Sequence, residues 1–228
     1  MFIGTFPLTA NDDIAGFGDM KMATYKLTYF DFSGGRGEPI RIALHAAGIT
    51  FEDNRLTFSE FSEIRQDTRF SALPVFEIDG VQVTQSNAIC RYVGKLAGLY
   101  PKDGLQALYC DEAMDAVEDL GGRIGQTLGL KDEELRAARE KLTDGWLTIF
   151  LKGLGGLLER GGGRYFAGNS LTVADLKVLM NTRWLRSGVL DHVPKDLADR
   201  IAPNLVEHQA RIEAEPVVKA YYSSRPQA

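Results

Sequence analysis

The stretch that decides the fold runs from Thr24 to Pro39 and reads TYKLTYFDFSGGRGEP. In its first half Tyr25, Leu27 and Tyr29 occupy alternate positions, which is typical of a β-strand. A glycine-rich turn that carries an arginine follows, and the proline suits the first turn of a helix. We therefore predict a strand that ends in an exposed tyrosine, and a turn that leads directly into a helix.

The segment after this helix supplies the rest of a small sheet. A strand-helix-strand order implies parallel pairing with a right-handed crossover, and Asp79-Gly80 is a strong hairpin signal. Residues 24–98 therefore predict a thioredoxin-like α/β domain. In chain order we expect a helix from Pro39 to Gly48, a strand at 51–55, hairpin strands at 75–78 and 81–84, and a helix capped by Ser86 that ends at Gly98.

The second half of the chain is helical in pattern. Residues 105–125 and 132–160 predict two long helices, and the glycines at 161–163 interrupt the chain. Residues 172–175, TVAD, form a variant of the capping box at the start of a further helix, and we assign them a structural role. The expected parts are a disordered extension at 1–22, the thioredoxin-like domain at 23–99, and an all-helical domain at 104–228.

Composition excludes several classes of function. The net charge of −5 argues against binding to nucleic acid or to an anionic membrane, and no apolar run is long enough to span one. Cys90 and Cys110 stand in helical apolar patterns, so we expect reduced, buried thiols in a cytosolic protein. The three histidines are scattered, and their spacing resembles no metal site, so no metal is expected.

The motifs in this order resemble the cytosolic glutathione transferases, most of all the sigma class and related bacterial and protist enzymes. The resemblance covers residues 24–222 and implies a homodimer that uses glutathione as co-substrate. It also implies that the second substrate is a small hydrophobic electrophile. The motifs that carry the resemblance are YKLTYF (25–30), GRGEPIR (35–41), Leu73-Pro74, QSNAI (85–89) and LTVAD (171–175).

The resemblance implies that Tyr29 and Arg36 are catalytic. A tyrosine hydroxyl can donate a hydrogen bond to the glutathione sulfur, and a nearby cation favours the thiolate. Tyr29 could instead only pack at the sheet, and Arg36 could pair with Glu38. The chain also departs from the sigma pattern, because one extra residue separates Tyr29 from Arg36 and Ser33 becomes a rival donor.

Four residues would bind the middle and the γ-glutamyl end of glutathione. In the family the peptide bond between residues such as Leu73 and Pro74 is cis, and the backbone there pairs with the cysteine of glutathione. Gln85 and Ser86 would bind the γ-glutamyl group, since a helix N-terminus offers free N–H groups to a carboxylate. A helix cap without a ligand remains the alternative for Ser86.

Three more residues are assigned by the resemblance. Phe61 and Arg65 stand where the sigma pattern has a tryptophan and a lysine that reach the glycyl end, and Ala72 replaces a longer polar residue. Asp111 matches an aspartate that reaches the γ-glutamyl ammonium in the neighbouring subunit. On an exposed helix without a dimer, the same aspartate would simply be solvated.

Three functions remain open from the sequence. The first is a transferase that stabilises the glutathione thiolate for attack on an electrophile. The second is a non-catalytic carrier of glutathione or hydrophobic ligands, and the third is a glutathione-dependent isomerase or peroxidase. The resemblance implies that the all-helical domain forms the pocket for the electrophile. This pocket would lie between residues 30–35 and the first helices of the second domain, near Gly121, Gly122, Gly125 and Leu128. Tyr221 and Tyr222 would either close the pocket or pack on the core.

Overall fold

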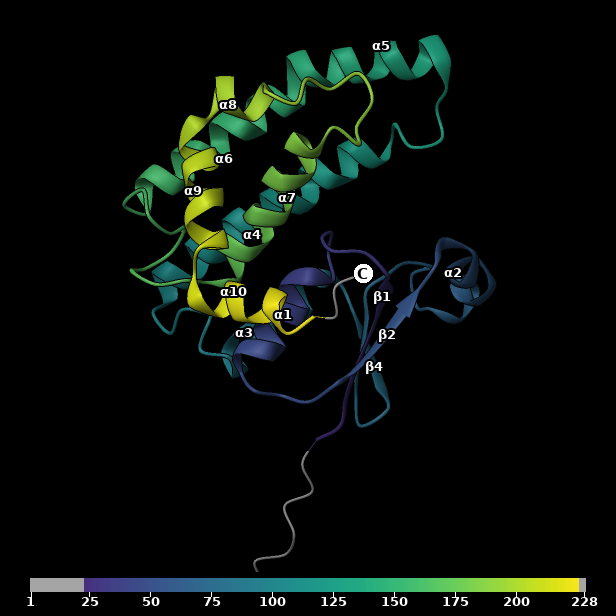
Figure 1. Ribbon diagram of the computed structural model, residues 1–228, viewed down its shortest axis with the longest axis vertical. Helices are drawn as coiled ribbons and strands as arrows, with labels where there is room; N and C mark the ends of the chain where they lie inside the picture. The colour runs from purple at the N-terminus through teal and green to yellow at the C-terminus, as the bar shows by residue number, and fades with distance from the viewer. Residues whose placement is uncertain (1–22, 226–228) are drawn as a thin grey trace, which may run out of the picture.

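The computed structural model describes residues 23–225, and the predicted extension at 1–22 lies outside the described residues. A small mixed sheet with helices forms the first part, and a larger group of helices follows (Figure 1). This architecture is the predicted thioredoxin-like domain with an all-helical domain. The strands are β1 (Tyr25–Phe30), β2 (Glu52–Leu56), β3 (Val75–Ile78) and β4 (Val81–Thr84), in the spatial order β2-β1-β3-β4.

The sheet has the register that the hydrophobic pattern requires. β1 pairs with β2 in parallel and with β3 antiparallel, so that Leu27 lies opposite both Asp53 and Phe76. β3 and β4 form an antiparallel hairpin that turns at Asp79 and Gly80, where Gly80 has a φ of 80°. Leu27 and Phe76 are buried in the core shared with the helices. The predicted parallel pairing of the first two strands and the predicted hairpin are confirmed.

The first domain contains a helix that the sequence pattern did not predict. Thr57 and Glu60 form a full capping box at its start, with the Glu60 side chain accepting from the Thr57 N–H at 2.7 Å. The cap of the last helix also differs from the prediction, because Gln85 is its cap and Ser86 its first residue. The helical segments are α1 (Glu38–Ala46), α2 (Phe58–Ile64), η1 (Arg65–Asp67) and α3 (Ser86–Leu96).

The second domain departs from the prediction at one point. The single helix expected over 132–160 is divided by a wide, π-type turn, where the Thr148 hydroxyl donates to the Thr143 carbonyl at 2.8 Å. Gly145 within this turn lowers the local helix propensity. The helices are α4 (Gly104–Gly125), α5 (Asp132–Leu142), η2 (Thr143–Leu147), α6 (Thr148–Arg160), α7 (Val173–Ser187), α8 (Leu197–Ile201), α9 (Pro203–Glu213) and α10 (Pro216–Ser223).

Helix α7 is the central element of the molecule. It packs against α1 and α3 of the first domain and against α4 and α9 of the second. The predicted capping box is present at its start, where the Asp175 carboxylate accepts from the Thr172 N–H at 2.8 Å. The last helix returns to the first domain, because α10 lies beside α1 (Figure 1). Helix α7 thus brings second-domain side chains to the start of α3.

Candidate functional site

Tyr29 stands at the end of β1 and is buried, with 5% of its surface exposed. The prediction of an exposed tyrosine was therefore wrong. Its hydroxyl oxygen accepts a hydrogen bond from the Arg36 backbone N–H at 2.9 Å, which leaves the hydroxyl proton available to a further acceptor. Burial raises the pKa of Tyr29, against the lowering effect of the Arg36 N–H, so the side chain is a neutral donor.

Glycines let the loop close over this tyrosine. Gly35 has a φ of 62°, and a Cβ added there would lie 2.5 Å from the Tyr29 hydroxyl oxygen. A Cβ at Gly37 would overlap the ring carbons of Tyr29. The extra residue in the loop therefore leaves the Arg36 N–H within bonding distance of Tyr29. Ser33 is exposed, and its hydroxyl accepts from the Arg225 guanidinium at 2.6 Å.

The Arg36 side chain points to the second domain. Its Nε donates to Glu118 Oε2 at 2.6 Å, and Glu118 belongs to α4. The alternative pairing with Glu38 is wrong, because Glu38 is fully buried and its carboxylate contacts Arg41 at 3.3 Å and Arg225 at 3.1 Å. Arg36 thus supports Tyr29 with its backbone and anchors α4 with its guanidinium.

A cavity of about 230 Å³ opens next to these residues. The Leu73–Pro74 peptide bond on its wall is cis, as predicted. Gln85 has a φ of 72°, which is unusual for a residue other than glycine and which turns the chain into α3. The Ser86 side chain is buried and donates to Glu118 at 2.7 Å. The cavity is lined by Arg36, Phe70, Ala72, Leu73, Pro74, Thr84, Gln85, Ser86 and Glu118.

Four of the assigned residues do not line this cavity: Tyr29, which lies against Arg36, and three residues with contacts elsewhere. Phe61 packs edge-to-face on Phe30, with 5.4 Å between the ring centroids. Arg65 is exposed, and its Nε donates to the Ser71 carbonyl at 3.1 Å. Asp111 accepts from Arg91 at 2.7 Å and from the Tyr100 hydroxyl at 3.0 Å within its own chain. These contacts leave the binding roles of the three residues as predictions.

The sequence pattern missed Glu118 and Lys177. The Lys177 ammonium, on α7, contacts Glu118 Oε1, the Asn87 amide oxygen and, at 3.1 Å, the Ser86 hydroxyl. A lysine inside the apolar run from Leu176 to Met180 was the available signal. Burial alone would raise the pKa of Glu118, but Lys177 and then Arg36 hold it at about 2.

The lowered pKa of Glu118 predicts that this residue makes an acid-sensitive contribution to stability. Because the pKa of Glu118 falls from 4.5 to about 2 on folding, its contribution is present above about pH 4.5 and is lost as the pH drops toward 2. We expect Glu118→Gln to lower the free energy of unfolding at neutral pH, with a difference from the wild type that shrinks across this window. Urea unfolding at several pH values measures it, and a constant difference would contradict the assignment.

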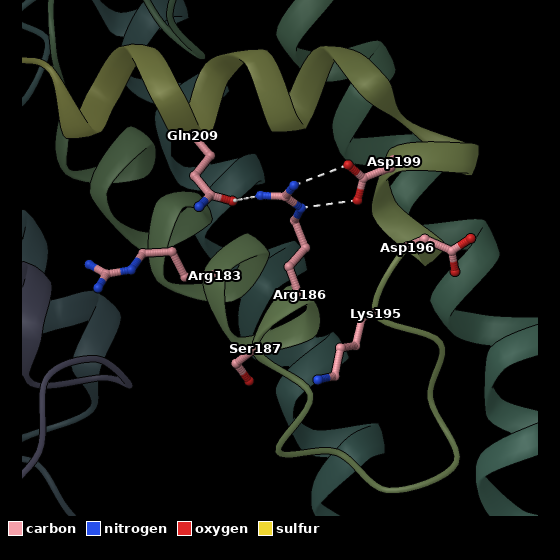
Figure 2. Close-up of a pocket in the computed structure, with 7 residues that line it drawn as sticks. All are labelled: Arg183, Arg186, Ser187, Lys195, Asp196, Asp199 and Gln209. Carbon is pink, nitrogen blue, oxygen red and sulfur yellow. Dashed lines mark hydrogen bonds and ion pairs between the residues drawn. The ribbon is translucent and has the colours of Figure 1, made fainter.

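A larger cavity, of about 550 Å³, lies at α7, α8 and α9 and is lined by none of the predicted residues. Figure 2 shows that Arg186 points across it to Asp199 and Gln209. Its guanidinium bonds both carboxylate oxygens of Asp199, each at 3.0 Å, and Gln209 at 3.1 Å. This guanidinium is already paired, so we interpret the cluster as a structural link between the helices.

The predicted second-substrate region near Gly121, Gly122, Gly125 and Leu128 lines neither cavity described above and stays a prediction. Gly121 on α4 faces Arg36, since a Cβ there would lie 3.5 Å from the guanidinium. Tyr221 is buried in a cluster with Ile42, and the Tyr222 hydroxyl accepts from Arg183 at 2.8 Å. The two tyrosines therefore pack on the core. Over residues 23–225, no group of three or more His, Cys, Asp or Glu is placed to hold a metal, and no helix has the length and apolar character to cross a membrane.

Comparison with known proteins establishes the family. Residues 25–95 match the family model described as the glutathione S-transferase N-terminal domain, and residues 118–225 match the C-terminal domain of the same family. Glutathione S-transferase 1 of Ascaris suum is 31% identical over 90% of this chain and 98% of its own. Hematopoietic prostaglandin D synthase of Gallus gallus is 32% identical with the same coverage. The chain belongs to the glutathione S-transferase family of enzymes.

Solved structures agree with this family. Prostaglandin synthase D of Nilaparvata lugens superposes with a TM-score of 0.78 at 30% identity, over 90% of this chain and 100% of that one. A glutathione S-transferase of Necator americanus, described as monomeric, gives a TM-score of 0.71 at 28% identity, over 90% and 98% of the two chains. The sheet and the helical domain are thus those of the family.

Proposed function

We propose that the protein is a tyrosine-type glutathione transferase that holds the glutathione sulfur as a thiolate against the Tyr29 hydroxyl. The observation that carries this proposal is the bond from the Arg36 N–H to the Tyr29 oxygen, which aims a neutral donor from a buried site. A free thiol has a pKa of about 8.5, and a hydrogen bond to a charged acceptor contributes about 1.5–3 kcal/mol. That is enough to lower the thiol pKa by one to two units.

The cavity supports a definite orientation of glutathione. The γ-glutamyl carboxylate would meet the N-terminus of α3 at Gln85 and Ser86, and the cysteinyl backbone would pair with Leu73 beside the cis bond. The glycyl carboxylate would reach Arg65 once its guanidinium leaves the Ser71 carbonyl. The thiolate then attacks a hydrophobic electrophile of the kind removed in detoxification. A carbon–sulfur bond forms as the substrate's own leaving group departs with its electron pair, or as the adduct takes up a proton in an addition, and proximity is the second contribution.

The test is turnover of the full chain with glutathione and chlorodinitrobenzene, together with calorimetric titration of glutathione. Turnover with binding supports the transferase. Binding without turnover of this or other electrophiles would contradict the proposal and favour the carrier. Absence of glutathione binding would contradict both.

A second candidate is a glutathione-dependent isomerase. The similarity to prostaglandin D synthases of Gallus gallus and Nilaparvata lugens favours it specifically. Such a reaction would use the same thiolate at Tyr29 and would return the glutathione unchanged. Glutathione-dependent formation of prostaglandin D by the purified chain is the assay for it, and a hydroperoxide substrate tests the peroxidase alternative.

We further propose a cytosolic homodimer in which Asp111 of one chain reaches the glutathione of the other. We expect a dimeric mass in light scattering, and a Kd for glutathione that rises severalfold in Asp111→Ala. A relative from Necator americanus is described as monomeric, so the family contains the alternative that this measurement decides for or against. A monomeric mass with full glutathione affinity would contradict the proposal, and Asp111 would then serve only its own Arg91 and Tyr100.

A further inference from the structure

Lys177 is a buried ammonium in the N-terminal half of α7, with 3% of its surface exposed. An isolated buried charge is strongly unfavourable, so such a lysine needs partners for its protons. Its contacts are the Ser86 hydroxyl at 3.1 Å, the Asn87 side-chain oxygen and the Glu118 carboxylate. Ser86 and Asn87 are the first two residues of α3. The ammonium therefore lies beside the helix N-terminus that forms one wall of the smaller cavity.

The charges around this ammonium do not cancel. Glu118 lies between two cations, with Oε1 on Lys177 and Oε2 on the Arg36 guanidinium at 2.6 Å. Two cations and one carboxylate leave one positive charge in this cluster. Arg36 and Glu118 both line the cavity, and so does Ser86, the first residue of α3.

The neighbouring carboxylates, Asp111 and Asp115, belong to a separate group of charges. The Asn87 amide donates to Asp115 at 2.5 Å, and Asp115 and Asp111 both pair with Arg91. Asp115 is linked to Lys177 through the neutral Asn87 side chain, whereas Asp111 bonds Arg91 and Tyr100. The excess positive charge is therefore joined to the cavity residues Ser86 and Glu118, while both aspartates are joined to Arg91.

We propose that Lys177 is a positioning residue that makes the cavity selective for a ligand with a free γ-glutamyl α-carboxylate. The inference rests on the proposed function and adds the residue that sets the charge of this subsite. The Lys177 ammonium donates a hydrogen bond to the Ser86 hydroxyl oxygen. It also adds a full positive charge to the partial positive charge of the α3 N-terminus. The ligand carboxylate supplies the anion that the cluster lacks.

The experiment compares two ligands on matched proteins. Calorimetry would measure the Kd of glutathione and of glutathione amidated at the γ-glutamyl α-carboxylate, which differ by one charge. We expect the wild type to prefer glutathione about tenfold or more, and Lys177→Met to reduce the preference to less than about threefold. A merely structural role would weaken both ligands equally and leave the ratio unchanged, which would overturn the inference.

Steady-state kinetics supply a second readout. With chlorodinitrobenzene, Lys177→Met should raise the KM for glutathione while kcat at saturation stays within about twofold, because Lys177 does not touch the sulfur side of the site. A fall in kcat with an unchanged KM would overturn the inference. Lys195→Met, a lysine outside this cavity, is the control and should leave the KM and the ligand preference unchanged.

A further pair of variants separates the effect of the lysine charge from any loss of stability. Lys177→Met leaves Glu118 with fewer partners, whereas Glu118→Gln and Glu118→Gln/Lys177→Met both lack the carboxylate and differ only at the lysine. The preference for glutathione should be larger in Glu118→Gln than in the double variant, and equal preferences would overturn the inference. Failure of the wild type to bind either ligand would overturn the proposed function itself, which is a different result from binding without preference.

Discussion

Replacement of Tyr29 by phenylalanine is expected to lower kcat/KM for glutathione and chlorodinitrobenzene by about 10- to 100-fold at neutral pH. The substitution removes one hydroxyl from a buried ring, so the thiolate loses its donor and the Arg36 N–H loses its acceptor. The apparent pKa of bound glutathione should rise toward that of the free thiol. The pH dependence of kcat/KM measures this shift, and the rate should recover at alkaline pH.

Ser33→Ala is the matched control, since it also removes one hydroxyl from the same loop. The Ser33 hydroxyl accepts from Arg225 and is exposed, so we expect a rate within about twofold of the wild type. Loss of activity in Ser33→Ala with retention in Tyr29→Phe would reverse the assignment of the donor. Equal losses in both variants would indicate a damaged loop, which the thermal unfolding of each variant would reveal.

Replacement of Asp175 by alanine is expected to lower the free energy of unfolding by about 3–5 kcal/mol. The carboxylate is fully buried and bonds the N–H groups of Phe166 and Thr172, the Thr172 hydroxyl and the His208 ring. Its loss would leave these polar groups buried without an acceptor at the start of α7. Urea unfolding of the variant at neutral pH measures the change.

Asp196→Ala provides the comparison for this effect. Asp196 is exposed and pairs with Arg200 at 3.0 Å, so its replacement should change the free energy of unfolding by less than about 1 kcal/mol. Asp175→Ala that remains folded should keep its glutathione affinity, because Asp175 does not line the cavity. Similar stability changes in the two variants would contradict the structural role of the capping box.

The local pattern of the chain predicted most of the fold. Alternating side chains marked the strands, Asp79-Gly80 marked the hairpin, and the box at Thr172 marked the start of α7. The two elements that differ from the prediction also have local sequence signals. The capping box of Thr57 and Glu60 starts the unpredicted helix α2, and Gly145 lies where the long helix is divided. Short-range signals such as these are readable because each depends on neighbouring residues.

The site itself was only half predictable. Tyr29, Arg36, Leu73, Pro74 and the Gln85-Ser86 pair belong to short motifs of the first domain, and the structure brings all but Tyr29 to the cavity wall and Tyr29 against Arg36. The charge partners of these residues come from elsewhere in the chain. Glu118 is 82 positions from Arg36, and Lys177 is 91 positions from Ser86.

The sequence by itself determined the chain order of the strands and the family resemblance, and it singled out Tyr29 as the candidate donor. Only the tertiary structure decided that the tyrosine is buried, that Arg36 turns to α4 rather than to Glu38, and that Lys177 lies under the start of α3. The physical reason is that the packing of distant helices against each other determines which charged side chains become partners. A lysine in an apolar helix carries no local sign of its partner, and burial then requires that the packed neighbour be a carboxylate.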